Sequence, residues 1–202
     1  MATEGLLDLR RQHKALMGAL KDDHDTAELR SFTESGKFEN VLVGLHLAEN
    51  YETAELYEFL RPCAESVVEG GIPAEWLESS YFVLALYLDN GCTAVPIASL
   101  SASFRPSPTN TVVTHFESVH SDFRGRGYGG LLFDMLHLVV QYMSVNDGFM
   151  SLNLRGQESL PVHVYVDETD PVWHVGMLER RGYKRLDEME DGAQIMEKVF
   201  YL

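Results

Sequence analysis

The ten residues from 121 to 130, Ser-Asp-Phe-Arg-Gly-Arg-Gly-Tyr-Gly-Gly, constrain this chain more than any other feature. They follow a strand-like run, Thr111 to Val119, and precede an apolar run with helical spacing, Leu131 to Met143. The pattern predicts a strand, a glycine-rich turn and a helix start. Glycines let a backbone approach a ligand closely, and the free N–H groups of a first helical turn attract anions. Because two arginines add positive charge, the sequence predicts a site for a diphosphate group.

The rest of the chain predicts an α/β (α+β) domain built around that turn. Asn90-Gly91 is typical of a tight hairpin, and Pro96 indicates a bulge or an edge position in the following strand. The order expected after residue 37 is β-α-β-β-β-α-β-α-β-β, with an antiparallel meander in the middle and an irregular segment at 144–161. Strands are predicted at 41–48, 81–88, 93–104, 111–119, 162–166, 183–188 and 193–201, and helices at 50–63, 131–143 and 171–181.

The first 37 residues are predicted to form an N-terminal helical appendage. Apolar residues recur there at helical spacing, with charged residues between them. We therefore divide the chain into an N-terminal helical appendage, 1–37, and one domain, 38–202. The sequence leaves open whether the helix packs on that domain or mediates a homodimer. The spaced residues are Leu6, Leu9, His13, Leu16, Met17 and Leu20.

The glycine-rich turn also carries a resemblance to a known family. The six residues Arg124-Gly125-Arg126-Gly127-Tyr128-Gly129 fit the pattern Gln/Arg-x-x-Gly-x-Gly/Ala and lie between a fourth strand and its helix. There they resemble motif A of the GNAT superfamily of acetyl-CoA-dependent N-acyltransferases, and residues 177–183 resemble the family's closing motif. The resemblance covers 38–202. It implies the GNAT fold, a mixed and mostly antiparallel sheet flanked by helices, whose central strands splay apart.

A dinucleotide-binding fold is the alternative interpretation of the same glycines. Gly125, Gly127 and Gly130 also satisfy the pattern GxGxxG. That fingerprint needs parallel strands on both sides of it, whereas an antiparallel meander precedes these glycines. The dinucleotide interpretation is therefore disfavoured.

The resemblance implies which residues bind the acyl donor, acetyl-CoA. The backbone N–H groups of the turn would bind the diphosphate of coenzyme A. The backbone of Glu117, Ser118 and Val119 would hydrogen-bond the pantetheine arm like an added strand. The turn residues are Arg124, Gly125, Arg126, Gly127, Tyr128, Gly129 and Gly130.

Amine acetylation needs a general base, because an alkylamine with a pKa of about 10 is mostly protonated at neutral pH. Alternation along a strand predicts that Val113, His115, Glu117 and Val119 share one face. By resemblance the base comes from this face, so His115 is the first candidate and Glu117 the second. The alternative that each is a solvated or hydrogen-bonded strand residue stays open.

The leaving thiolate needs a proton, and the family's usual donor is absent. The resemblance places a tyrosine four residues before the glycine that ends the last helix, and Leu178 stands there. An asparagine that often binds the cofactor is replaced by Pro171. His174 lies one helical turn before Leu178 and is a candidate acid. The alternatives are a packed histidine beside Trp173, and a thiolate that leaves without enzymic protonation.

Charge and cysteine content limit the partners. The formal net charge is −15, which disfavours nucleic acid and anionic membranes and mildly favours a cationic substrate, although an acidic surface also aids solubility. Cys63 and Cys92 lie in no metal-binding spacing, so we expect buried free thiols and no metal. Residues 1–20 match neither a signal peptide nor a membrane span. A cytoplasmic protein is expected, with a nuclear one left open.

The resemblance therefore predicts an N-acetyltransferase that uses direct attack in a ternary complex. A small cationic primary amine is the first expected acceptor, and a protein or peptide amine is the second. The alternative is a GNAT-like acyl-CoA-binding or regulatory module without transferase activity, suggested by Leu178 and Pro171.

Overall fold

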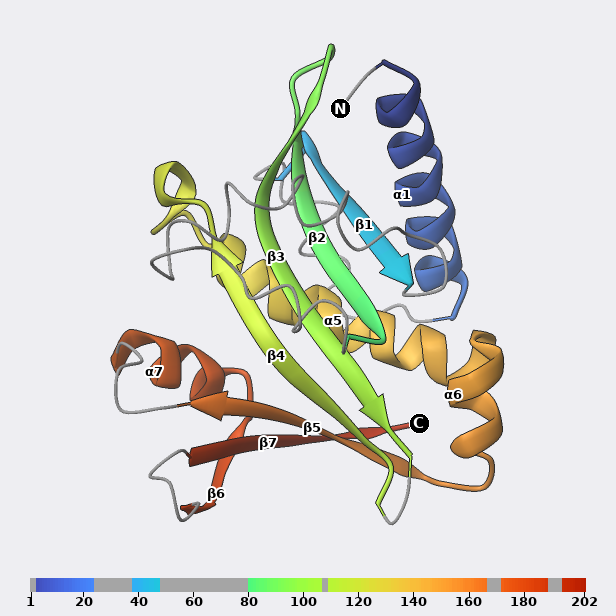
Figure 1. Cartoon of the computed structure of the whole chain (residues 1–202), viewed down its shortest axis with the longest axis vertical. Helices are drawn as coiled ribbons and strands as arrows, with labels where there is room; N and C mark the ends of the chain where they lie inside the picture. Colours follow the sequence, from blue (N-terminus) through green and yellow to red (C-terminus); the bar gives the residue numbers. More distant parts are fainter. Residues whose placement is uncertain (1–2, 24–37, 48–79, 107–108, 167–171, 189–193) are drawn as a thin grey trace.

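The computed structural model describes residues 3–23, 38–47, 80–106, 109–166, 172–188 and 194–202. They form a seven-stranded sheet in the order β1-β2-β3-β4-β5-β7-β6, flanked by helices (Figure 1). The predicted strands and their order are confirmed. The strands are β1 (Val41–Leu47), β2 (Phe82–Asp89), β3 (Ala94–Arg105), β4 (Thr111–Val119), β5 (Ser159–Val166), β6 (Lys184–Glu188) and β7 (Gln194–Tyr201), and the helices are α1 (Thr3–Asp23), η2 (Ser121–Phe123), α5 (Tyr128–Asn146), α6 (Gly148–Asn153) and α7 (Val172–Arg180).

Strands β1 to β4 form the antiparallel meander that the sequence predicts. Gly91 has a φ of 91°, as the predicted Asn90-Gly91 turn requires. The β2–β3 register shifts where Tyr87 pairs with Pro96, so the bulge expected at Pro96 is present. The mixed, mostly antiparallel fold is confirmed.

The sheet opens between β4 and β5. Their parallel pairing includes Val112 with Val162 and ends at Thr114 with Val164. Beyond that point β4 continues to Val119 without pairing to β5, and the two strands diverge (Figure 1). The splay of the central strands is therefore confirmed.

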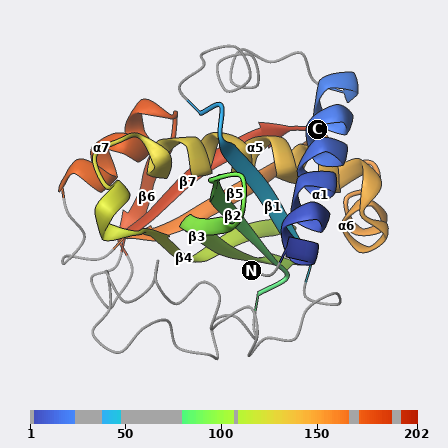
Figure 2. The same ribbon diagram turned by 90° about the horizontal axis from the view of Figure 1, so that it is seen from above.

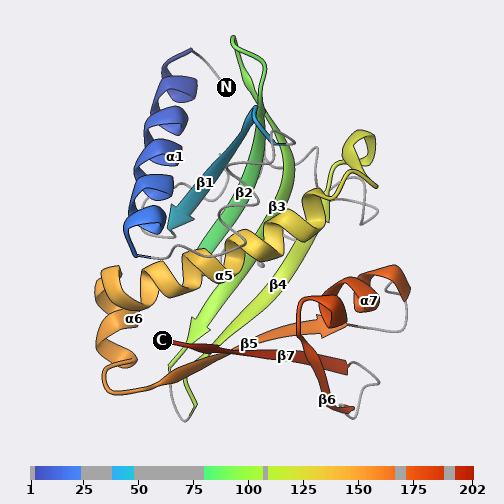
Figure 3. The ribbon, with the colours of Figure 1, turned by 180° about the vertical axis from the view of Figure 1, so that it is seen from behind.

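Helix α5 covers one face of the sheet, as seen from above in Figure 2 and from behind in Figure 3. We call this the α5 face and the other the far face. Leu100 and its β2 partner Leu84 lie on the α5 face, in the main core with Leu132 and Leu136 of the helix. Ser99 and its partner Ala85 lie on the far face, because neighbouring strand residues alternate between faces.

Helix α1 packs on the sheet, which is one of the two arrangements that the sequence leaves open. The imidazole Nδ1 of His13 accepts a 3.0 Å hydrogen bond from the Val43 N–H of edge strand β1. Arg10 donates two hydrogen bonds, of 2.7 and 2.8 Å, to the carboxylate of Asp89. Leu20 is fully buried in the main core. The helix therefore shields the β1 edge, which would otherwise be open to pairing with another chain.

Leu20→Ala should cost about 2–5 kcal/mol of unfolding free energy, because it leaves a cavity in the core that α1 shares with the sheet. Urea unfolding measures this loss. Leu7→Ala is the matched control, since Leu7 lies on the same helix but is 47% exposed, and it should shift stability by less than about 0.5 kcal/mol. Equal, small shifts for both variants would contradict the packing of α1.

Two expectations are wrong, and others lie outside the described residues. The segment 144–161 is not irregular throughout: α5 extends into it, α6 follows, and the Asp147 side chain caps α6 by accepting from the N–H groups of Phe149 and Met150. Cys92 is exposed and not buried. The helix predicted at 50–63, with Cys63, lies outside the described residues. No described helix is long and apolar enough to span a membrane.

Candidate functional site

The glycine-rich turn links the end of β4 to the start of α5. Gly125 has a φ of 73° and Gly127, the N-cap of α5, a φ of 92°. Residues with a side chain rarely adopt this left-handed region, so both positions favour glycine. The turn thereby directs the start of α5 toward the end of β4, as the sequence predicts.

The start of α5 offers unsatisfied N–H donors. The first N–H in the helix with a backbone partner is that of Leu131, which donates to the Gly127 carbonyl at 3.0 Å. Among the described residues, the N–H groups of Tyr128, Gly129 and Gly130 have no protein acceptor. The first turn carries no acidic side chain. The N–H groups, the positive end of the helix dipole and the absence of acidic side chains therefore all favour an anion at this position.

Aromatic rings and two arginines stabilise the turn. The ring of Phe123 lies 6.1 Å from that of Tyr128, which in turn lies 5.7 Å from the ring of Phe38. The guanidinium of Arg126 lies 5.4 Å from the centre of the Phe123 ring, a cation–π distance. Arg124 Nε donates to the Val119 carbonyl at 3.2 Å. The turn is therefore held in place while the Arg126 side chain stays exposed.

The end of β4 that does not pair with β5 presents backbone groups to the gap between the two strands. The His120 N–H donates to Ile97 of β3 at 2.9 Å. Backbone groups of alternate residues point toward the same neighbouring strand, so Ser118 also faces β3. Glu117 and Val119 then face the gap. The three predicted pantetheine residues are therefore not equivalent.

The prediction that His115 and Glu117 share one face is wrong. In the β3–β4 register Ala102 pairs with Thr114 and Ser101 with Phe116, so His115 is the extra residue of a bulge. A bulge reverses the alternation beyond it. Glu117 pairs with Leu100 and so lies on the α5 face.

His115 lies on the far face. Its Nε2 and the hydroxyl of Ser103 are 2.7 Å apart and share a hydrogen bond. Ser103 pairs with Val113, on the face opposite to Leu100. The ring is half-buried. Burial, followed by the charge of Arg105, lowers the pKa of His115 below its ordinary value of 6.5, so the ring is neutral at pH 7.

Glu117 and His174, predicted separately, meet on the α5 face. His174 Nε2 of α7 lies 2.6 Å from Glu117 Oε1 of β4, with side-chain exposures of 7% and 23%. The two atoms are within ion-pair distance, although the contact does not have the geometry of a hydrogen bond. Leu178, at the usual tyrosine position, is fully buried one turn further along α7. Pro171 and the Trp173 side chain lie outside the described residues.

A buried phenol, that of Tyr183, and a second buried imidazole, that of His137, lie close to this pair, and the sequence analysis did not single them out. Burial, and then the negative charge of Glu117, raises the pKa of Tyr183, so its phenol stays protonated. Burial and the charges of Lys198 and Arg181 lower the pKa of His137 to about 3. His137 Nε2 lies 3.4 Å from the Tyr183 hydroxyl. His137 lies on α5 and Tyr183 just beyond α7, far apart in the sequence, so no local sequence pattern identifies them.

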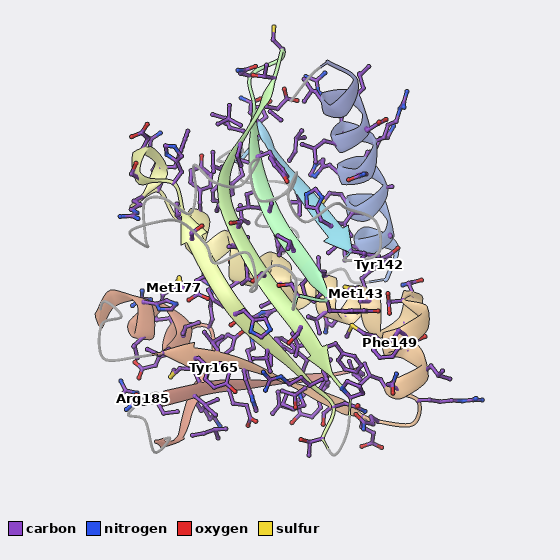
Figure 4. The ribbon with its side chains drawn as sticks, in the orientation of Figure 1. Tyr142, Met143, Phe149, Tyr165, Met177 and Arg185 are labelled. Carbon is purple, nitrogen blue, oxygen red and sulfur yellow. The ribbon has the colours of Figure 1, made fainter. Side chains whose placement is uncertain are left out.

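Helix α7 also contacts the glycine-rich turn of residues 124–130, which we call the cradle. The sulfur of Met177, labelled on α7 in Figure 4, would lie 3.9 Å from a Cβ at Gly129. Val119 Cγ2 would lie 3.5 Å from the same Cβ, which is ordinary contact. The cradle, the end of β4 and α7 thus form one continuous site. Within the described ranges no cluster of histidine, cysteine or acidic residues fits a metal ion.

Comparisons with known proteins identify the fold. No family model matches the sequence, and no curated protein sequence matches it significantly. Solved structures do match. The NatC complex bound to Gag peptide and CoA has a chain with 12% identity and a TM-score of 0.53, covering 81% of this chain and 99% of that one.

Two other matches come from a plant and a bacterium. Arabidopsis thaliana Naa50, in complex with the bisubstrate analogue CoA-Ac-MVNAL, has 11% identity and a TM-score of 0.50, covering 79% of this chain and 99% of that one. A GNAT-family acetyltransferase from Streptococcus pneumoniae has 16% identity and a TM-score of 0.53, with the same coverage. The chain therefore has the GNAT fold, and the resemblance predicted from residues 124–129 is confirmed at the level of the fold.

Proposed function

We propose that the protein is an N-acetyltransferase that transfers an acetyl group from acetyl-CoA to an amine. The observation that carries this proposal is the junction of two features in one fold. A turn with free N–H donors opens directly beside a sheet that splits between β4 and β5. An anion site next to an unpaired strand edge suits a ligand with a diphosphate at one end and an amide-bearing arm at the other.

The residues of the turn fit the donor. The N–H groups from Arg124 to Gly130 would hold the diphosphate, and the exposed Arg126 would add charge. Glycine at 129 is not demanded by protein packing, because a Cβ there would meet only ordinary contacts. Backbone groups of Glu117 and Val119 would bind the pantetheine arm. Ser118, which faces β3, would contribute none of those hydrogen bonds.

The two faces of the sheet would separate the two substrates. Because the N-terminus of α5 lies on the α5 face, the donor reaches the gap from that face. The amine then approaches from the far face, where His115 lies. Its neutral ring can accept the proton that the amine nitrogen loses as it attacks the thioester carbon, directly or through a water. An N–H near Val119 would stabilise the oxyanion.

The leaving group departs on the α5 face. As the carbon–sulfur bond breaks, the electron pair stays on sulfur, and the thiolate takes a proton from the His174–Glu117 pair. A nearby carboxylate favours the protonated form of an imidazole, so Glu117 would hold His174 as an acid. Glu117 is then the partner of the acid and not a second base.

Small cationic primary amines are the first acceptor class that we propose, in keeping with the net charge of −15. Peptide amines are the second. Two structures of the same fold hold a peptide with CoA and a CoA–peptide bisubstrate analogue, so the fold accommodates such acceptors.

His115→Ala should lower kcat/KM by about 100-fold near neutral pH, through loss of the base. The loss should be greatest between the lowered pKa of His115 and the amine's own pKa, where the base is free and the amine is still protonated, and should shrink as pH rises toward the amine's pKa. Because the pKa of His115 is lowered, the wild type should lose base catalysis only below about pH 6.5. His163→Gln is the matched control, a far-face histidine held by Glu197 at 2.9 Å. Equal pH–rate profiles for His115→Ala and the wild type would exclude His115 as the base.

Thiol release from acetyl-CoA, measured against a panel of small amines and peptides, tests the proposed function. We expect release that depends on the amine and is matched by formation of the acetylated product. The alternative is an acyl-CoA-binding module without transferase activity. The buried Leu178, at the position of the family's usual acid, favours this alternative. Tight acetyl-CoA binding with no amine-dependent release would favour that module.

A further inference from the structure

An arginine from another part of the chain fills the space beside Gly130, the last glycine of the turn. A Cβ at Gly130 would collide with Nη2 of Arg181 and would lie 2.9 Å from its Cζ. At Gly129, by contrast, the nearest atom would be 3.5 Å away. A Cβ at 130 would therefore displace the Arg181 guanidinium, whereas a Cβ at 129 would displace nothing.

Arg181 contacts two positions of α5 that lie one helical turn apart, Gly130 and Asp134. Its Nε donates to the Gly130 carbonyl at 3.1 Å and to Asp134 Oδ1 at 2.9 Å. Its Nη2 donates to Asp134 Oδ2 at 3.1 Å. The planar guanidinium matches a carboxylate at two points, which fixes direction as well as distance. These hydrogen bonds, which we call the clamp, hold the first turn of α5 in a fixed position.

The backbone of Arg181 is itself fixed. It lies just beyond α7, where the Tyr183 N–H donates to the Leu178 carbonyl at 3.1 Å and the Gly182 N–H to the Glu179 carbonyl at 3.0 Å. With a φ of 85° at Gly182, this is a Schellman cap. The clamp therefore joins the first turn of α5 to a rigid helix end, on the helix that carries His174.

We propose that Arg181 is a positioning residue of the donor site, which sets the N–H groups of the first turn of α5 for the diphosphate. This rests on the proposed function. Asp134 offsets the charge of Arg181, so the effect works through geometry more than through the field of the cation. Gly130 is small to admit Arg181, and not to admit the donor.

Calorimetric measurement of acetyl-CoA binding tests the role of the Arg181 guanidinium. Arg181→Met and Arg181→Lys should each weaken acetyl-CoA binding about tenfold, because lysine keeps the charge but cannot replace the two-point contact. Binding of S-acetylpantetheine, which lacks the diphosphate, should be unchanged when measured by ligand-observed NMR. Arg180→Met, an exposed neighbour on α7, should match the wild type.

A double variant separates the two reasons for a glycine at 130. Gly130→Ala should weaken acetyl-CoA binding about as much as Arg181→Met, because the new Cβ displaces the guanidinium. In the Arg181→Met background, Gly130→Ala should cause no further loss. This readout does not depend on how much stability either change removes, since both backgrounds lack the clamp.

Three outcomes would overturn the inference. Arg181→Lys binding like the wild type would show that charge suffices. Equal losses for acetyl-CoA and S-acetylpantetheine would show a general structural defect. A further tenfold loss in the double variant would show that the donor itself needs Gly130. If the wild type does not bind acetyl-CoA at all, the proposed function fails, and the inference fails with it.

Discussion

Gly127→Glu should weaken acetyl-CoA binding by about 100-fold or more while the protein stays folded. Gly127 caps α5 with a φ of 92°, at the centre of the N–H cradle. A glutamate there places a side chain where the diphosphate would lie and a negative charge beside it, so contact and Coulomb repulsion act together. Calorimetric titration with acetyl-CoA measures the loss, and circular dichroism confirms folding.

The matched control for this variant is Gly156→Glu. Gly156 also has a positive φ, of 82°, and a Cβ there would meet nothing within 4 Å. Both variants therefore pay the same kind of backbone penalty, about 1–2 kcal/mol, but only one lies in the cradle. We expect Gly156→Glu to bind acetyl-CoA like the wild type. Unchanged affinity in Gly127→Glu would remove the cradle as the diphosphate site.

The second large effect is expected at the pair on the α5 face. Glu117→Gln and His174→Gln should each lower kcat about 100-fold, with little change in the KM for acetyl-CoA, because the pair acts on the leaving thiolate and not on donor binding. The double variant should be no worse than either single one, since the two groups work as a unit.

A change of leaving group tests this role against a merely structural one. An acetyl thioester whose thiol is more acidic needs less help to depart, so both single variants should regain most of the wild-type rate with it. If the losses are the same for every thioester, or if the double variant loses the product of the two single effects, the pair is not the proton donor.

The sequence predicts local structure well where the cause is local. The glycines of the turn, the Asn90-Gly91 hairpin and the strand and helix periods are all set by neighbours along the chain, and the structure confirms them. Together with the resemblance of residues 124–129 to motif A, they were enough to predict the GNAT fold, and the resemblance implied its splayed strands. The Asp147 cap that starts α6 is also local, and it could have been found from the Asp-Gly pair at 147–148.

The arrangement of the site could not be predicted, because it depends on pairings between distant residues. The bulge at His115 arises from the β3–β4 register, and strand alternation without it places His115 and Glu117 on the same face. The Glu117–His174 contact joins β4 to α7, and the Arg181 clamp joins α7 to α5. A tyrosine missing from position 178 is visible in the sequence, whereas the contact between Glu117 of β4 and His174 of α7 is not.

A crystal structure with acetyl-CoA bound tests the central claim most directly. The account predicts the diphosphate within hydrogen-bond distance of the N–H groups between Gly125 and Gly130. It also predicts the pantetheine arm between β4 and β5, paired with Glu117 and Val119, and a thioester with His115 on one side and His174 on the other. A donor bound elsewhere, or a gap closed by protein with the diphosphate away from the turn, would contradict it.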